Sequence, residues 1–90
     1  MSVTKLLKIV NEKGLHARAS ARFVETVEAH DARAEVARDG MRVSGDSIMG
    51  LLMLAAARGT TIEVTTTGME AEALAAALEA LVADRFGEDN

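Results

Sequence analysis

The segment Gly14-Leu15-His16-Ala17-Arg18 places an imidazole and a guanidinium two residues apart, directly before an amphipathic stretch. A neutral imidazole is a nucleophile, and a guanidinium pairs with phosphate oxygens. A helix that begins here would add the unpaired backbone N–H groups of Ala17 and Arg18 and the positive end of its dipole. Gly14 would permit the turn that brings the chain close to a ligand. The combination favours a phosphoryl group on or beside His16.

A histidine at a helix start also has a simpler interpretation, as a surface or N-cap residue without chemistry. No second acid or base lies within the motif itself. A hydrolase or an autonomous transferase would need one, whereas a protein that carries phosphate between other proteins can leave those groups to its partners. The motif is therefore more typical of a carrier than of an enzyme.

Ser47 is a second candidate site, at the start of an apolar segment. Serine is a favoured helix N-cap, which is the simpler interpretation. A phosphate there would add about −1.5 to −2 charges, which a helix start tolerates and an acidic partner repels. The segment that follows is apolar nearly all round, so one side can fill the core while the other forms a docking surface. The alternative is a helix buried on both sides.

The length and composition favour one small cytoplasmic domain. Ninety residues allow a single domain over 1–90 with a modest core. The chain has no cysteine, which excludes disulfides and thiolate metal sites, and its two histidines cannot by themselves make a convincing zinc site. No apolar run reaches the ~20 residues that span a bilayer, and the first residues lack the hydrophobic segment of a secretory signal. We expect no metal and no cofactor.

The charge is distributed unevenly along the chain. The net charge of −4 and the absence of Trp and Tyr argue against a nucleic-acid partner. Residues 1–22 carry five basic side chains against Glu12 alone, whereas residues 68–90 carry six acidic side chains against Arg85. The end that contains His16 is thus locally basic, as expected if it meets phosphate or an acidic partner. The acidic tail is most simply interpreted as solvated surface.

Hydrophobic periodicity predicts seven elements in the order β-α-β-β-α-β-α. They are a strand around Leu7 to Ile9, a helix over 16–29, a hairpin with strands around 34–36 and 41–43, a helix over 48–58, a strand over 60–67 and a helix over 69–86. Asp39-Gly40 is typical of a type I′ hairpin turn, in which both central residues have positive φ. In a single small domain this order predicts an α+β fold with an antiparallel or mixed sheet and helices on one face.

The chain resembles the HPr family of histidine phosphocarriers of the bacterial phosphoenolpyruvate phosphotransferase system, which includes a nitrogen-related branch. Two motifs carry the resemblance: the segment Gly14-Leu15-His16-Ala17-Arg18, and the segment Asp46-Ser47-Ile48-Met49-Gly50-Leu51-Leu52-Met53-Leu54. The likeness extends from roughly Leu6 to Phe86. It implies an open-faced β-sandwich, a four-stranded antiparallel sheet with three helices on one face.

The resemblance also implies roles for single residues. His16 would accept a phosphoryl group at Nδ1 from phospho-enzyme I and pass it to an EIIA-type protein, and Arg18 would stabilise that group. Ser47 would be modified by an HPr kinase/phosphorylase, in organisms that have one, and this would lower transfer through His16. Donor and acceptor would dock on a surface formed by Ser20, Arg22, Ile48, Met49, Leu52 and Met53. The implied protein is a monomeric carrier without membrane insertion.

Ala19 departs from the family pattern, because many members have proline at this position. Proline pre-sets φ in the first helical turn, so alanine should loosen the helix start slightly without removing a phosphate ligand. The run Met53-Leu54-Ala55-Ala56-Ala57 and the strand Ile62-Glu63-Val64 resemble the nitrogen-related branch, whereas Ser47-Ile48-Met49-Gly50 resembles the kinase-regulated HPr of sugar transport. The branch and the downstream acceptor stay open.

A second function is a regulatory binding module that acts mainly through Ser47 and the apolar helix. Such a module would hardly use His16. Family relatives that serve only regulation typically lack the histidine. The presence of His16 therefore favours the phosphocarrier.

Overall fold

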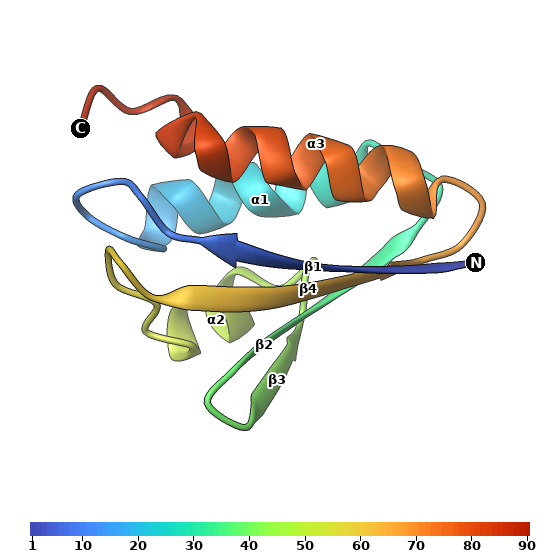
Figure 1. Cartoon of the computed structure of the whole chain (residues 1–90), viewed down its shortest axis with the longest axis horizontal. Helices are drawn as coiled ribbons and strands as arrows, with labels where there is room; N and C mark the ends of the chain where they lie inside the picture. The colour runs from blue at the N-terminus through green and yellow to red at the C-terminus, as the bar shows by residue number, and fades with distance from the viewer.

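The computed structural model describes all 90 residues. Its strands are β1 (Ser2–Lys8), β2 (Arg33–Arg38), β3 (Met41–Ser44) and β4 (Thr61–Thr67), and its helices are α1 (Ala17–Glu28), α2 (Ile48–Met53) and α3 (Ala71–Ala83). The strands form one antiparallel sheet in the order β1-β4-β2-β3 (Figure 1). The predicted α+β fold and element order are confirmed.

Alternation of side chains in β4 gives the sheet one buried face. Ile62, Val64 and Thr66 are buried, while the residues between them are not. The register sets Ile62 opposite Leu7 of β1 and Val64 opposite Val36 of β2. Because paired residues in neighbouring strands point to the same face, the buried side chains of three strands form one continuous apolar surface.

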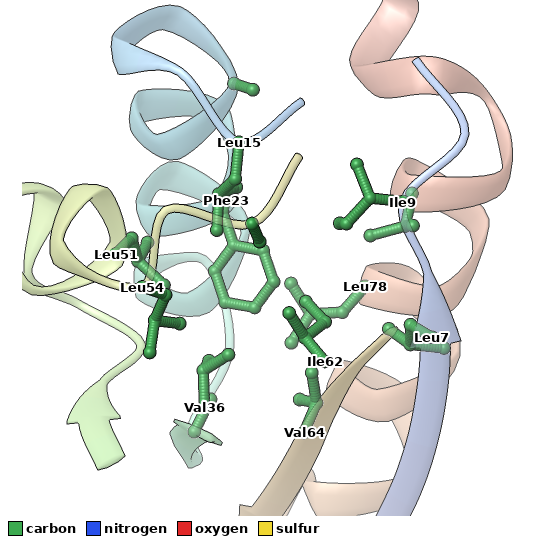
Figure 2. Close-up of a cluster of buried hydrophobic side chains, with 14 of the residues drawn as sticks. Leu7, Ile9, Leu15, Phe23, Val36, Leu51, Leu54, Ile62, Val64 and Leu78 are labelled. Atoms are coloured by element: carbon green, nitrogen blue, oxygen red, sulfur yellow. The ribbon is translucent and has the colours of Figure 1, made fainter. Parts of the chain in front are cut away.

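The helices cover that apolar surface. Figure 1 shows α1 and α3 lying over the sheet, and Figure 2 shows Phe23 of α1 pointing toward Leu78 of α3 and Ile62 of β4. Leu51 and Leu54, from α2 and its end, belong to the same cluster of buried residues. Burying one such side chain contributes about 1.5–3 kcal/mol, so this packing sets the position of α1. None of the helices is long and apolar enough to cross a membrane.

The predicted hairpin turn is confirmed. Asp39 and Gly40, which join β2 to β3, have φ values of 50° and 82°. Positive φ at both central residues is what a type I′ turn requires, and its twist matches that of the flanking strands.

The predicted helix over 48–58 is too long, because α2 ends at Met53. Ala55 adopts a left-handed conformation with φ 49°, which takes the chain out of the helix. The Arg38 side chain donates from Nη1 to the Leu54 carbonyl oxygen at 2.9 Å, so a residue of β2 satisfies this carbonyl at the helix end. This tertiary contact ends the helix before Gly59.

The predicted helix over 69–86 is also too long. α3 ends at Ala83, and a 3₁₀ turn over Arg85–Gly87 follows. Arg85 and Phe86 have φ values of 56° and 55°, a left-handed pair that takes the chain out of the helix. Phe86 is completely buried as a result. Burial of this ring offsets the cost of the left-handed backbone and turns the tail toward α1.

The loop before α1 is fixed by close backbone packing. Gly14 has φ 68°, its N–H donates to the Asn11 carbonyl oxygen at 3.2 Å, and the Leu15 N–H donates to the Ala56 carbonyl oxygen at 2.9 Å. A Cβ atom at Gly14 would lie 2.6 Å from the Ala56 oxygen. The loop is therefore hydrogen-bonded to, and tightly packed against, the segment after α2. This packing fixes the position of His16.

Gly14→Ala is expected to lower the free energy of unfolding by about 2–4 kcal/mol, because alanine meets both the left-handed φ and a backbone clash. Gly40→Ala is the matched control: its φ is also positive, but no atom lies within 4 Å of a Cβ placed there. Its cost should be about 1 kcal/mol. Urea unfolding measures both values, and equal costs for the two variants would contradict this account of the loop.

Candidate functional site

His16 is the N-cap of α1. Its backbone is extended, with φ −79° and ψ −175°, and its side chain makes no capping hydrogen bond. Its carbonyl oxygen accepts the Ser20 N–H at 2.8 Å, which starts the helical hydrogen-bond ladder. The N–H groups of Ala17 and Arg18 therefore have no acceptor within the helix. The imidazole, 28% exposed, lies at the positive end of a helix that can receive an anion.

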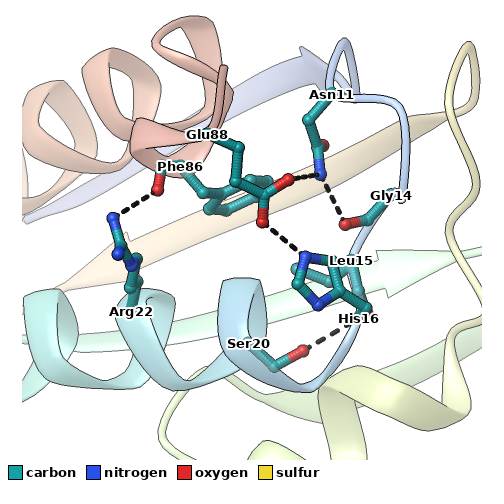
Figure 3. Close-up of polar contacts among 8 residues, drawn as sticks. All are labelled: Asn11, Gly14, Leu15, His16, Ser20, Arg22, Phe86 and Glu88. Carbon is teal, nitrogen blue, oxygen red and sulfur yellow. Dashed lines mark hydrogen bonds and ion pairs between the residues drawn. The ribbon is translucent and has the colours of Figure 1, made fainter. Parts of the chain in front are cut away.

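Glu88 is the partner of the imidazole. The His16 Nε2 atom is hydrogen-bonded to the Glu88 Oε2 atom, although the two residues lie 72 positions apart in the chain (Figure 3). The Glu88 side chain is only 16% exposed. The expectation that the acidic tail is merely solvated surface is therefore wrong at this residue. The structure supplies beside His16 an acidic group that the motif itself lacks.

The buried side chain of Asn11 holds Glu88 in place. Asn11 Nδ2 donates to the Glu88 Oε1 atom at 3.0 Å and to the Gly14 carbonyl oxygen at 2.7 Å. Figure 3 shows this amide between the loop and the tail. Asn11 thus joins the loop that presents His16 to the carboxylate that contacts it.

Two further hydrogen bonds fasten the tail to the rest of the protein. Arg22 of α1 donates from Nη1 to the Phe86 carbonyl oxygen at 2.7 Å, and the Glu12 N–H donates to the Asn90 carbonyl oxygen at 3.0 Å. The tail is therefore attached on both sides of Glu88.

The environment of Glu88 favours its charged form. Burial by itself raises the pKa of this carboxyl group, but hydrogen bonds from Asn11 and His16 and the positive charges of His16 and Lys13 act in the opposite direction. The net result is a pKa below the ordinary value for glutamate. Glu88 is therefore a carboxylate at neutral pH, and it accepts hydrogen bonds only.

Arg18 is an unpaired cation beside His16. Its side chain is exposed and makes no hydrogen bond or ion pair within the protein. Together with Lys13 and Ala17 it lines a surface hollow beside His16, whose other side is the tail. A guanidinium without an internal partner is available to an anion in that hollow. No group of three or more His, Asp or Glu side chains comes together that could hold a metal ion.

Ser47 and the apolar surface of α2 lie apart from the imidazole contact. The Ser47 Oγ accepts the Gly50 N–H at 3.0 Å, so the prediction that it caps a helix is confirmed. Leu51 is buried, whereas Ile48, Met49 and Met53 are 40%, 70% and 63% exposed and Leu52 is half-buried. The helix is therefore apolar on its exposed side as well, which excludes burial on both sides.

Two residues of the expected docking surface make hydrogen bonds to carbonyl oxygens of the protein itself. Ser20 is completely buried and its hydroxyl donates to the Leu15 carbonyl oxygen at 3.3 Å, so it cannot contact a partner directly. This corrects its placement on the docking surface. Arg22 is exposed, but its guanidinium binds the Phe86 carbonyl oxygen.

Reasoning from the sequence missed Asn11 and Glu88. Asn11 lies in the bend between β1 and α1, a position where asparagine is common and signals nothing about a buried amide. Glu88 is one of six acidic residues near the end of the chain, and no spacing sets it apart from the others. The left-handed turn at Arg85 and Phe86, which follows α3, places it beside His16.

Glu88→Gln is expected to lower the free energy of unfolding at neutral pH by about 1 kcal/mol, since the hydrogen bonds from Asn11 and His16 lose their charged acceptor. The pKa of Glu88 is lower in the folded protein than in the unfolded chain. Its stabilisation is therefore complete above the ordinary glutamate pKa and is lost as the pH falls through the lowered value. Urea unfolding at a series of acidic pH values should show the difference closing.

Glu79→Gln is the control for this titration, because Glu79 pairs with Lys5 at an exposed position, 3.4 Å from its Nζ. An exposed pair contributes about 0–1 kcal/mol, so this variant should differ little from the unmodified chain. A Glu88→Gln difference that persisted unchanged at acid pH would contradict the assignment of the stabilisation to the carboxylate.

The chain matches a family model described as "PTS HPr component phosphorylation site" over residues 3–84. It is 49% identical over 83 residues to the phosphocarrier protein HPr of Neisseria meningitidis, covering 91% of this chain and 92% of that protein. It is 37% identical over 90 residues to the phosphocarrier protein NPr of Escherichia coli K12, covering 99% and 100%.

Solved structures agree with these sequence matches. The crystal structure of HPr-C-His from Thermoanaerobacter tengcongensis is similar with a TM-score of 0.89 and 33% identity, covering 100% of this chain and 99% of that chain. The crystal structure of an HPr from Bacillus anthracis is similar with a TM-score of 0.86 and 37% identity, covering 90% and 96%. Since sequence and fold agree over nearly the whole chain, the protein belongs to the PTS-HPr family of phosphocarriers.

Proposed function

We propose that this protein carries a phosphoryl group on the Nδ1 atom of His16, receives it from phospho-enzyme I and passes it to an EIIA-type protein. The observation that carries the proposal is the asymmetry of the imidazole. Nε2 is bound to Glu88, whereas Nδ1 has no hydrogen-bond partner within the protein. The ring therefore has one free nitrogen, and it lies at the start of α1, where backbone N–H groups are unpaired.

The transfer can be written with the groups at hand. The Nδ1 electron pair attacks the phosphorus atom of the phosphorylated donor, and the donor's bond to phosphorus breaks with its electron pair returning to the donor. The Arg18 guanidinium and the first N–H groups of α1 meet the negative charge of the phosphoryl oxygens. Onward transfer is the same step with the roles of donor and acceptor exchanged.

The position of Glu88 supports a carrier more than a hydrolase. A carboxylate could activate water, but this one is bound to Nε2, at the far edge of the ring from Nδ1. No other carboxylate is hydrogen-bonded to His16. No carboxylate is therefore fixed at Nδ1 to direct water at phosphorus, and we expect a phosphoryl group there to persist until an acceptor protein binds.

The exposed side of α2 supports a docking surface on the helix that contacts α1. Ile48, Met49 and Met53 are exposed, and α2 contacts α1, whose start carries His16. Methionine side chains adapt to differently shaped partners, which suits a surface that serves both a donor and an acceptor. Leu52, half-buried, would complete the apolar surface.

Ser47 adjoins this surface, and its position supports a regulatory role for phosphorylation of its hydroxyl group. It immediately precedes Ile48, and its hydroxyl lies at the N-terminus of α2. A phosphate would add about −1.5 to −2 charges there, which would repel acidic partner surfaces. In an organism with a suitable kinase, we expect phosphorylation of Ser47 to lower transfer through His16.

His16→Ala is expected to abolish phosphorylation by phosphoenolpyruvate and enzyme I, because the nucleophilic nitrogen is removed. The unmodified chain should acquire one acid-labile phosphate, detected as a mass increase that disappears on acid treatment. His30→Ala is the matched control: its imidazole is bonded through Nδ1 to the Thr26 carbonyl oxygen and lies outside the site. Undiminished labelling of the His16→Ala variant would refute the proposal.

Met49→Glu is expected to lower kcat/KM for transfer from phospho-enzyme I about tenfold or more, since a charge would have to be desolvated at the docking surface. Met69→Glu is the control, because Met69 is 87% exposed and lies just before α3, outside the proposed surface. Both variants should unfold at the same urea concentration as the unmodified chain. Equal transfer rates for the two variants would exclude α2 from the docking surface.

A further inference from the structure

We propose that Glu88 is a positioning residue for phosphoryl transfer: it keeps the proton of the His16 ring on Nε2, and so leaves the electron pair of Nδ1 free to attack. This inference rests on the proposed function of His16. It assigns to the tail a part in the chemistry rather than in folding alone.

The tautomer follows from the chemistry of the contact. A carboxylate has electron pairs but no hydrogen to donate, so the His16 nitrogen that faces it must carry the proton. The opposite tautomer would set two electron pairs against each other at Nε2. In a neutral ring with its proton on Nε2, Nδ1 is the unprotonated nitrogen. Carboxylates fix the tautomer and the orientation of histidine rings in the same way in other sites.

The carboxylate is held more firmly than a surface ion pair. Its other oxygen accepts from Asn11, which is completely buried, and the adjacent ring of Phe86 is completely buried as well. The Phe86 carbonyl oxygen is in turn bound by Arg22. Glu88 is thus tied to the loop before His16 and to the helix after it. A side chain restrained from both directions can hold the orientation of an imidazole.

The same contact serves the return step. After transfer, the ring carries the phosphoryl group on Nδ1 and a proton on Nε2, and its positive charge lies beside the Glu88 carboxylate. When an acceptor attacks phosphorus, the bond from phosphorus to Nδ1 breaks and its electron pair returns to Nδ1. The ring leaves as neutral imidazole with its proton still on Nε2. No proton has to be gained or lost, and the site is ready for the next cycle.

The negative charge of Glu88 is compatible with a phosphoryl group because the two lie at different edges of the ring. The carboxylate is at Nε2, whereas the phosphoryl group would be at Nδ1. The hollow is lined by the basic side chains of Lys13, Arg18 and Arg22 and also by the acidic side chains of Glu12 and Asp89. The exposed cations Lys13 and Arg18 offset part of the repulsion between the two anions at the ring.

The tautomer can be measured directly by ¹⁵N NMR of the His16 ring at neutral pH in the full chain. We expect the proton on Nε2 in the unmodified protein and a mixture of tautomers in Glu88→Gln, because a glutamine amide can either accept from Nε2 or donate to it. Asp84→Asn is the matched control, since Asp84 is exposed, makes no side-chain hydrogen bond or ion pair and does not line the hollow beside His16. Glu88→Ala provides a second variant, which removes the carboxylate and keeps the full chain.

Transfer kinetics with phospho-enzyme I supply the second measurement. Loss of a residue that orients a functional histidine typically costs about 10–100-fold, so kcat/KM should fall by about tenfold in Glu88→Gln and in Glu88→Ala, and not in Asp84→Asn. An unchanged tautomer with an unchanged rate would overturn the proposal, and so would faster transfer, which would mark the tail as a cover over His16. If the unmodified chain accepts no phosphate at all, the carrier function itself fails, whereas the NMR measurement still tests the role of Glu88.

Discussion

The geometry of the site depends on the buried side-chain amide of Asn11. Both of its hydrogen-bond contacts come from Nδ2: one to the loop that presents His16, the other to the Glu88 carboxylate. Its Oδ1 atom is buried without a partner in the protein, and such an unsatisfied acceptor is costly. This orientation of the amide persists because turning it over would set an oxygen against two acceptors. Asn11 therefore fixes the position of the tail relative to the loop before α1.

The hydrophobic core determines where the loop and the tail meet. Phe23 and its neighbours anchor α1 on the sheet, and Phe86 anchors the end of the chain beside it. Hydrophobic packing thereby sets the coarse positions of helix and tail, while directional hydrogen bonds set the fine positions of His16 and Glu88. The two kinds of interaction act on different scales, and the site needs both.

Local patterns were sufficient to predict most of the fold. The alternation in β4, the apolar face of α1 and the Asp39-Gly40 turn each follow from the conformational preferences of a few neighbouring residues. The ends of α2 and α3 do not, because Ala55 and Phe86 adopt left-handed conformations that only tertiary contacts favour. The same limit applies to the site: His16 and Arg18 are visible as a motif, whereas the contact with Glu88 depends on the left-handed turn after α3.

The fastening of the tail makes the two ends of the chain unequal. The last residues lie along the edge of the hollow beside His16, and the Asn90 carbonyl oxygen accepts a hydrogen bond from the loop. The N-terminus lies at the opposite end of the molecule (Figure 1). A peptide or reporter domain fused after Asn90 would add bulk beside the imidazole and compete with the partner proteins, whereas a fusion before Met1 would leave that edge open. The amino end is thus the place for a tag in any study of this protein with its partners.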